Sequence, residues 1–186
     1  MTLVVSPGEG GTQQYMQSHW ARPLADLLSV VASLVSLFTN DRARLSTELP
    51  HAGDLLYVGH GTADALGSPA LFDGVNVAGI GGRIVAVACR SADRLGPNAV
   101  EAGTRGYVGF VDDLHVVNAE VLDELIIRNF EPLLTASWSE AEFEERFKAA
   151  CQGVQDDHFS GRRRRAPDAH IIGSAAQVMK LSVRAL

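Results

Sequence analysis

The sequence predicts a single α/β domain with a mainly parallel sheet, and three observations support this fold class. Short, continuous apolar runs at residues 55–59, 84–88 and 106–111 are typical of parallel strands that are covered on both faces. Other stretches repeat apolar residues at three- and four-residue steps, which indicates helices between the strands. With 186 residues, of which 46% are hydrophobic and 20% charged, the chain can bury a sizeable core and has a globular composition.

A strand, a loop and a long helix are expected ahead of the central runs. Residues 3–5 are apolar and stop before Pro7, so they predict a first strand, followed by a loop over residues 6–12. A helix is expected next, with Pro23 in its first turn and Asn40 at its end. Its predicted buried face consists of Leu24, Leu27, Leu28, Val31, Leu34, Val35 and Phe38.

The second half of the chain is predicted to add two helices and a last strand. Residues 116–134 have a helical pattern of apolar residues, and Ser139 and Glu142 form an S-x-x-E capping box before a further helix. Residues 169–173, Ala-His-Ile-Ile-Gly, are expected to form the last strand. No internal repeat or domain linker interrupts the pattern, so we expect one domain over residues 1–186.

A histidine and a cysteine each follow one of the central apolar runs. His60 comes directly after residues 55–59, and Cys89 comes directly after residues 84–88. Because ligands bind beyond the carboxyl ends of parallel strands, the two side chains would share one rim if the strands are neighbours. An imidazole can take the proton of a thiol and protonate a leaving amine near neutral pH. The backbone N–H groups of Gly61 and Cys89 could hold an oxyanion, so this pair predicts nucleophilic catalysis.

Each of these two residues has a plainer interpretation when it is taken singly. A cysteine after an apolar run is often a small core residue, and a single histidine is often structural or exposed. Catalysis is favoured by the pair, since both residues follow strands and both are flanked by small residues. Two alternatives stay open: a catalytically silent module that binds partners, and a cysteine hydrolase or transferase that acts on a non-peptide substrate.

The two motifs resemble those of the caspase-like cysteine peptidases of clan CD. Tyr-Val-Gly-His-Gly at residues 57–61 is similar to the histidine motif, and Val-Ala-Val-Ala-Cys-Arg-Ser-Ala at residues 85–92 is similar to the cysteine motif. Residues 102–113 and 169–174 resemble later strand patterns of the family. The short spacing from histidine to cysteine is nearest to bacterial CHAT-domain and other prokaryotic caspase-like proteins. Val87 stands where caspases have glutamine, so their preference for aspartate is not implied.

The resemblance implies a roughly six-stranded, mostly parallel sheet between helices and a cysteine-type endopeptidase. If this chain follows the family mechanism, Cys89 would attack the peptide carbonyl and His60 would protonate the departing amine. The backbone N–H groups of Gly61 and Cys89 would bind the oxyanion. This chemistry needs no metal and no cofactor. By analogy with prokaryotic relatives, the enzyme would act on protein or peptide substrates in a bacterial signalling or defence cascade, under an activating protein or peptidase.

An acidic pair is a candidate for binding substrate. Asp112 and Asp113 follow residues 106–111, so they should reach the same rim as His60 and Cys89. A carboxylate there can accept the guanidinium of an arginine or the ammonium of a lysine before the scissile bond. In separase-like relatives an acidic residue in a similar position selects arginine. The alternative is a solvated pair that caps the next helix.

A basic run is a candidate processing site. Its four residues lie between Ser160-Gly161 and Ala166-Pro167, which predicts an exposed loop where proteases cut. Either the chain itself or an upstream arginine-specific peptidase would cut there. A solvated loop or an anion-binding patch is the alternative. The run consists of Arg162, Arg163, Arg164 and Arg165.

Composition narrows the expected location and partners. A formal net charge of −6 argues against a general nucleic-acid binder, which is usually basic. No apolar run reaches the length of about 18 residues that a membrane span needs, and the first residues lack the features of a signal peptide. The two cysteines do not suggest a disulfide framework. We therefore expect a cytoplasmic protein without nucleic-acid or membrane partners.

Overall fold

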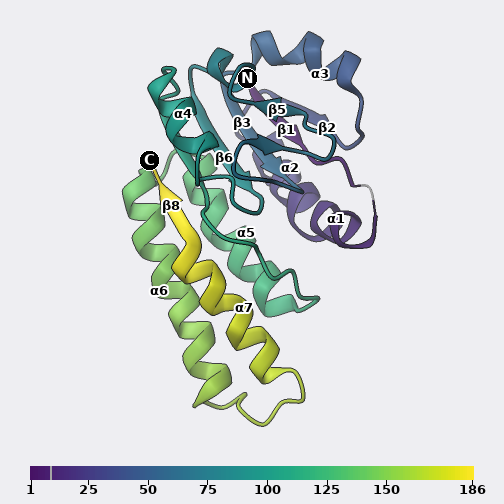
Figure 1. The fold of residues 1–186 in the computed structure, drawn as a ribbon. Helices are drawn as coiled ribbons and strands as arrows, with labels where there is room; N and C mark the ends of the chain where they lie inside the picture. The colour runs from purple at the N-terminus through teal and green to yellow at the C-terminus, as the bar shows by residue number, and fades with distance from the viewer. Residues whose placement is uncertain (9) are drawn as a thin grey trace.

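The apolar runs form the middle of a six-stranded sheet in the computed structural model, which describes residues 1–8 and 10–186 (Figure 1). The strand order is β2–β1–β3–β6–β7–β8, in which β8 alone is antiparallel to its neighbour. The predicted α/β fold with a roughly six-stranded, mostly parallel sheet is confirmed. The strands are β1 (Thr2–Val5), β2 (Leu34–Leu37), β3 (Asp54–Val58), β6 (Arg83–Val87), β7 (Gly106–Phe110) and β8 (Val183–Ala185), with a separate pair β4 (Ala65–Leu66) and β5 (Phe72–Asp73).

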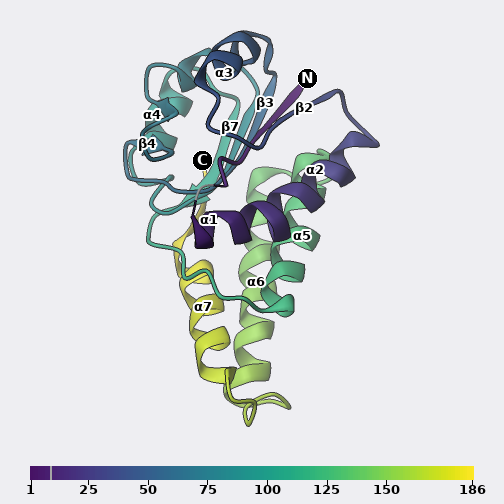
Figure 2. The ribbon, with the colours of Figure 1, turned by 90° about the vertical axis from the view of Figure 1, so that its right-hand side faces the viewer.

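Helices cover both faces of this sheet (Figures 1 and 2). They are α1 (Gly11–Met16), η1 (Gln17–Ala21), α2 (Arg22–Ser29), α3 (Arg42–Glu48), η2 (Leu49–His51), η3 (Val77–Gly79), α4 (Leu95–Glu101), α5 (Glu120–Leu134), α6 (Glu140–Phe159) and α7 (Ala169–Ser182). In the described part of the chain, no helix has the length and apolar content needed to cross a membrane.

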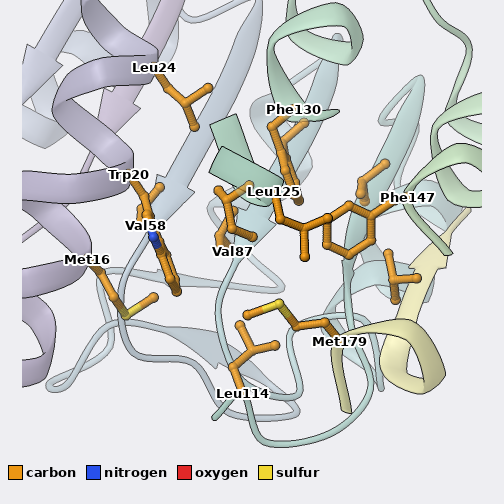
Figure 3. Close-up of a cluster of buried hydrophobic side chains, with 14 of the residues drawn as sticks. Met16, Trp20, Leu24, Val58, Val87, Leu114, Leu125, Phe130, Phe147 and Met179 are labelled. Carbon is orange, nitrogen blue, oxygen red and sulfur yellow. The ribbon is translucent and has the colours of Figure 1, made fainter. Parts of the chain in front are cut away.

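Alternate residues of each central strand supply two separate hydrophobic clusters. In β3, Leu56 and Val58 pack with residues of α1, α2, α5, α6 and α7, whereas Leu55 and Tyr57 pack with residues of α3, α4 and β5. Figure 3 shows part of the first cluster, in which Trp20 from η1 lies against Val58. Because side chains alternate across a strand, burial on both faces explains why these runs are continuously apolar.

The helix predicted from Leu24 to Phe38 is wrong beyond Ser29. There α2 ends, and β2 follows as an edge strand parallel to β1. Val31, which the helical pattern places on the buried face, has 63% of its surface exposed. Short apolar runs suit either structure, and here hydrogen bonds to β1 decide for a strand. The helical segment also begins earlier than expected, at Gly11, so Pro23 lies within it.

The last predicted strand is also wrong, because residues 169–173 begin the helix α7. The residues that follow are rich in helix formers and extend the helix to Ser182, with Ile172, Ala175 and Met179 buried on one side. The true last strand is β8. The predicted helix over residues 116–134 begins later, at Glu120. Glu9, in the predicted loop after the first strand, lies outside the described residues.

The predicted capping box at the start of α6 is confirmed, and a buried arginine ties the same region to the sheet. The Ser139 hydroxyl accepts from the backbone N–H of Glu142, whose carboxylate accepts from the backbone N–H of Ser139. At the start of β6, Arg83 donates to Glu140 Oε1 at 2.6 Å and to the carbonyl of Leu133 at the end of α5. Partial burial would raise the pKa of Glu140, but the Arg83 hydrogen bond and charge bring it below its ordinary value.

Removal of the Arg83 guanidinium should destabilise the protein. Arg83→Met removes the charged partner of the Glu140 carboxylate and one of the two donors to the Leu133 carbonyl, which keeps the N–H of Ala136, so we expect a loss of roughly 2–4 kcal/mol in the free energy of unfolding. Urea denaturation at unchanged slope measures it. Because the pKa of Glu140 is lowered in the folded state, the contribution is present above the ordinary value of 4.5 and is lost on further acidification.

The matched control is Arg94→Met, which removes the exposed ion pair with Asp64. That variant should lose less than about 1 kcal/mol. Equal losses in the two variants would contradict a special role for the buried guanidinium.

Candidate active site

His60 follows β3 on a segment whose backbone is hydrogen-bonded to a buried tyrosine. The Tyr57 hydroxyl donates to the carbonyl of His60 at 2.9 Å, and its ring packs edge-on against Phe72 at 5.9 Å. A Cβ at Gly59 would lie 2.8 Å from the Tyr57 oxygen, so a side chain at that position would displace the hydroxyl. The sequence motif around His60 therefore has a local reason: the tyrosine and the glycine together fix the backbone of the histidine, whose side chain is exposed.

Cys89 follows β6, and the structure brings it next to the segment of His60. Strands β3 and β6 are parallel neighbours with Val58 opposite Val87, as the prediction of a shared rim requires. A Cβ at Gly61 would lie 2.5 Å from the carbonyl oxygen of Cys89, so the two backbones are in close contact. In the described part of the chain, no hydrogen bond joins the exposed imidazole to Cys89 Sγ. Such contacts are often long before substrate binds.

The predicted oxyanion donors lie on the same rim. Gly61 pairs with Leu66 of β4 in an antiparallel bridge. Its two hydrogen bonds are formed by the flanking residues: the N–H of Thr62 donates to the carbonyl of Ala65, and the N–H of Gly67 donates to the carbonyl of His60. In this pattern the paired residues themselves direct their N–H groups away from the partner strand. The N–H of Gly61 therefore points away from β4. The backbone N–H of Cys89 lies beside its own sulfur, where it lowers the pKa of the thiol.

The Cys89 thiol is half-buried and accepts one hydrogen bond from the neighbouring loop. Burial raises its pKa above the ordinary value. The backbone N–H of Leu114 donates to Cys89 Sγ at 3.2 Å and lowers the pKa, while the charge of Asp113, and to a smaller extent that of Asp112, raises it. The balance of these effects favours the thiol over the thiolate, and the Leu114 N–H is the donor placed to stabilise the thiolate.

Ser91 fixes the turn after Cys89 to the adjacent strand. Its buried hydroxyl reaches the carbonyls of Ala86 and Ala88 and accepts from the backbone N–H of Phe110 in β7. A Cβ at Gly109 would lie 2.5 Å from this oxygen, so the strand needs glycine there. Sequence reasoning missed Tyr57, Ser91 and Leu114. The apolar Leu114 after two acidic residues was the available signal that the loop turns back toward the core.

Asp112 and Asp113 follow β7 and lie at the edge of the sheet that carries Cys89. The carbonyl of Asp112 accepts from the backbone N–H of Arg90, and both acidic side chains are exposed. Within residues 1–8 and 10–186 neither carboxylate forms an ion pair. The structure thus brings the acidic pair beside Cys89, and an arginine or lysine of a substrate as its partner stays a prediction.

A cavity beside the segment of His60 is a candidate binding site. It has a volume of about 430 Å³, adjoins His60 and Gly61 and is otherwise lined by small uncharged residues of the 62–70 segment. Another, of about 640 Å³, lies between the start of α6 and the chain end at Leu186. Its charged residues include Glu140, bound to Arg83, and Glu144, bound to Lys148. The first cavity is therefore the better candidate, since it adjoins His60 and Gly61.

The basic run lies far from Cys89. Arg162, Arg163, Arg164 and Arg165 are exposed in the turn between α6 and α7, at the end of a helical hairpin that extends away from the sheet (Figures 1 and 2). The opposite end of α7 contacts the sheet, since the backbone N–H of Val111 donates to the carbonyl of Ser182. The 14 residues of α7 span about 20 Å, which separates the turn from the candidate active site.

Comparison with models of protein families, with curated proteins and with solved structures found no match for this chain. The assignment of chemistry therefore depends on the residues and geometry described above.

The arginines at residues 162–165 lie far from Cys89. Self-processing there is therefore expected to occur between two molecules. Purified protein should be cut within residues 162–165, at a rate per molecule that rises with protein concentration, and Cys89→Ala should not be cut. Intact mass spectrometry measures the products. A cut that needs an added peptidase would indicate a cascade, and an uncut chain with full activity would leave the arginines with a structural or partner-binding role.

Proposed function

We propose that this protein is a cysteine endopeptidase in which Cys89 is the nucleophile and His60 the proton-transfer group. The observation that carries the proposal is the contact between the two strand-end segments, in which Gly61 lies against the backbone of Cys89. Two parallel strands end in a thiol and an imidazole on one rim, and a cavity beside the imidazole can admit part of a peptide. The motif resemblance to caspase-like peptidases is consistent with this arrangement.

In the proposed reaction the thiol proton passes to His60 and the thiolate attacks the carbonyl carbon of the scissile peptide bond. A carbon–sulfur bond forms and the carbonyl oxygen becomes an oxyanion, which the N–H groups of Gly61 and Cys89 stabilise. The carbon–nitrogen bond then breaks and His60 gives its proton to the departing amine. Water hydrolyses the thioester, with proton transfer again through His60, and restores the thiol.

The proposed specificity is for arginine or lysine before the scissile bond. Asp112 and Asp113 are the exposed carboxylates that follow β7 on the rim of Cys89, and a carboxylate can accept two hydrogen bonds from a guanidinium. A protein substrate in a bacterial signalling or defence cascade is consistent with this specificity.

A catalytically silent binding module is the second candidate. It is favoured by the raised pKa of Cys89 and by the exposed ring of His60. A peptidyl chloromethylketone that ends in arginine separates the two. An active enzyme is labelled at Cys89, whereas a silent module is not. A hydrolase that acts on non-peptide substrates would react with a simple thiol reagent and ignore peptides.

Replacement of either member of the dyad should remove activity while the fold persists. Cys89→Ala should abolish cleavage of a peptide library, and His60→Ala should slow it by roughly 10²–10⁴-fold, because proton transfer and activation of the thiol are lost. Turnover of the library, followed by mass spectrometry, is the measurement. Cys151→Ala and His51→Ala are the matched controls, since Cys151 is buried within α6 and His51 precedes β3, at the end of the strand opposite to His60. Unchanged turnover in Cys89→Ala or His60→Ala would end the peptidase assignment.

The acidic pair should set the preference at the residue before the cut. Substrates with arginine or lysine there should be cleaved best, and Asp112→Asn or Asp113→Asn should raise KM for them by about tenfold through loss of a charged partner. Asp26→Asn, on the exposed side of α2, is the control. A measured preference for aspartate would refute this specificity.

A further inference from the structure

The segment of residues 111–114 is hydrogen-bonded to its surroundings at Val111, Asp112 and Leu114. The backbone N–H of Val111 donates to Ser182 at the end of α7, and the carbonyl of Asp112 accepts from Arg90. The backbone N–H of Asp113 donates to Asp112 Oδ1 at 2.8 Å. The N–H of Leu114 then reaches Cys89 Sγ. The 111–114 segment is therefore a fixed wall of the candidate active site.

The side chain of Leu114 explains why its N–H is held at the sulfur. Only 8% of this residue is exposed, and it belongs to the cluster that contains Val87 and Met179. In Figure 3 the side chains of Leu114 and Met179 lie together on the side of the cluster below Val87. Burial of the leucine side chain thus directs its backbone N–H toward Cys89 Sγ. A hydrogen bond to an ionised acceptor is stronger than one to a neutral acceptor, so this N–H stabilises the thiolate more than the thiol.

The other charged groups around Cys89 do not cancel the two carboxylates. Arg90 pairs with Asp93 at 3.0 Å and is half-exposed. On the β3 side the segment after the strand carries the exposed His60, and beyond Leu114 the loop carries the exposed His115. The helical layer that packs near Leu114 presents apolar side chains, such as that of Met179 from α7 (Figure 3). Asp112 and Asp113 are therefore the anionic groups that oppose the thiolate, and they lie on the segment that supplies its donor.

We propose that the 111–114 segment couples substrate recognition to the nucleophile: the Leu114 N–H is a catalytic donor to the Cys89 thiolate, and the Asp112 and Asp113 carboxylates restrain that thiolate until a cationic side chain pairs with them. This inference rests on the proposed function. It adds a catalytic group to the reaction and gives the acidic pair a second role. A guanidinium bound to the carboxylates cancels their repulsion of the sulfur anion, so the substrate that fits the pocket also increases the thiolate fraction.

The coupling can be measured without peptide cleavage, by following the alkylation of Cys89 with uncharged iodoacetamide. Cys151 does not interfere at neutral pH, because it is fully buried and burial raises its pKa to about 12. The rate of labelling of the full chain is measured as a function of pH by mass spectrometry. Methylguanidinium chloride is the cationic probe, and methylurea with sodium chloride is its neutral counterpart at equal ionic strength.

Methylguanidinium should accelerate labelling of the wild-type protein at neutral pH by about threefold to tenfold, and methylurea should not. Asp113→Asn should react faster than wild type without any probe and should respond less to methylguanidinium. The double variant Asp112→Asn/Asp113→Asn should not respond. Unaltered labelling in these variants, or a wild-type rate that methylguanidinium leaves unchanged or lowers, would overturn the coupling.

The donor is tested by Leu114→Pro, which removes the N–H, beside Leu114→Ala, which keeps it. The proline variant should label about tenfold more slowly at neutral pH than the alanine variant, with its pH profile moved upward. Equal profiles would remove Leu114 from the catalytic groups. If Leu114→Pro does not fold, the asparagine variants still decide whether the segment controls the thiol. If labelling responds to methylguanidinium but no peptide is cleaved, the proposed function alone is contradicted. If peptides are cleaved but labelling does not respond, this inference alone is contradicted.

Discussion

Parallel hydrogen bonding between β3 and β6, with Val58 opposite Val87, determines which residues leave the sheet together. Parallel strands in register end at the same edge, so the residues after them meet although they are distant along the chain. The same pairing between β6 and β7 brings Asp112 and Asp113 to that edge. A shift of one residue would turn the apolar side chains of a strand to the opposite face, and burial on both faces opposes this.

Small residues and buried hydroxyls keep the loops at this edge close together. Gly61 lies against the backbone of Cys89, and Gly109 leaves room for the Ser91 hydroxyl that joins β6 to β7. The Tyr57 hydroxyl supports the histidine segment in the same way. The two hydroxyls give buried polar groups a partner where the regular ladder of the sheet ends, which avoids the cost of leaving them unsatisfied. The resulting backbone is close-packed, while His60 is exposed.

The helical hairpin of α6 and α7 is linked to the same edge through the end of α7. Ser182 accepts from Val111, and β8 then pairs antiparallel with β7. As the last strand of the sheet, β8 is covered in turn by α6, since the Glu144 carboxylate accepts from the backbone N–H of Ala185 at 2.7 Å. Sealing an edge in this way limits pairing with other chains. The turn of the hairpin, with its arginines, is left exposed and remote from the sheet.

The sequence by itself determined the central strands, the capped start of α6 and the edge at which His60, Cys89 and the acidic pair gather. Those features follow from continuous apolar runs and from local capping chemistry, which few alternative structures satisfy. Only the tertiary structure decided that residues 34–37 form a strand and residues 169–173 a helix, since a short apolar run fits either until its hydrogen-bond partner is known. It also decided that Leu114 donates to the sulfur of Cys89, because that contact joins two loops whose approach depends on how β6, β7 and the helical layer pack.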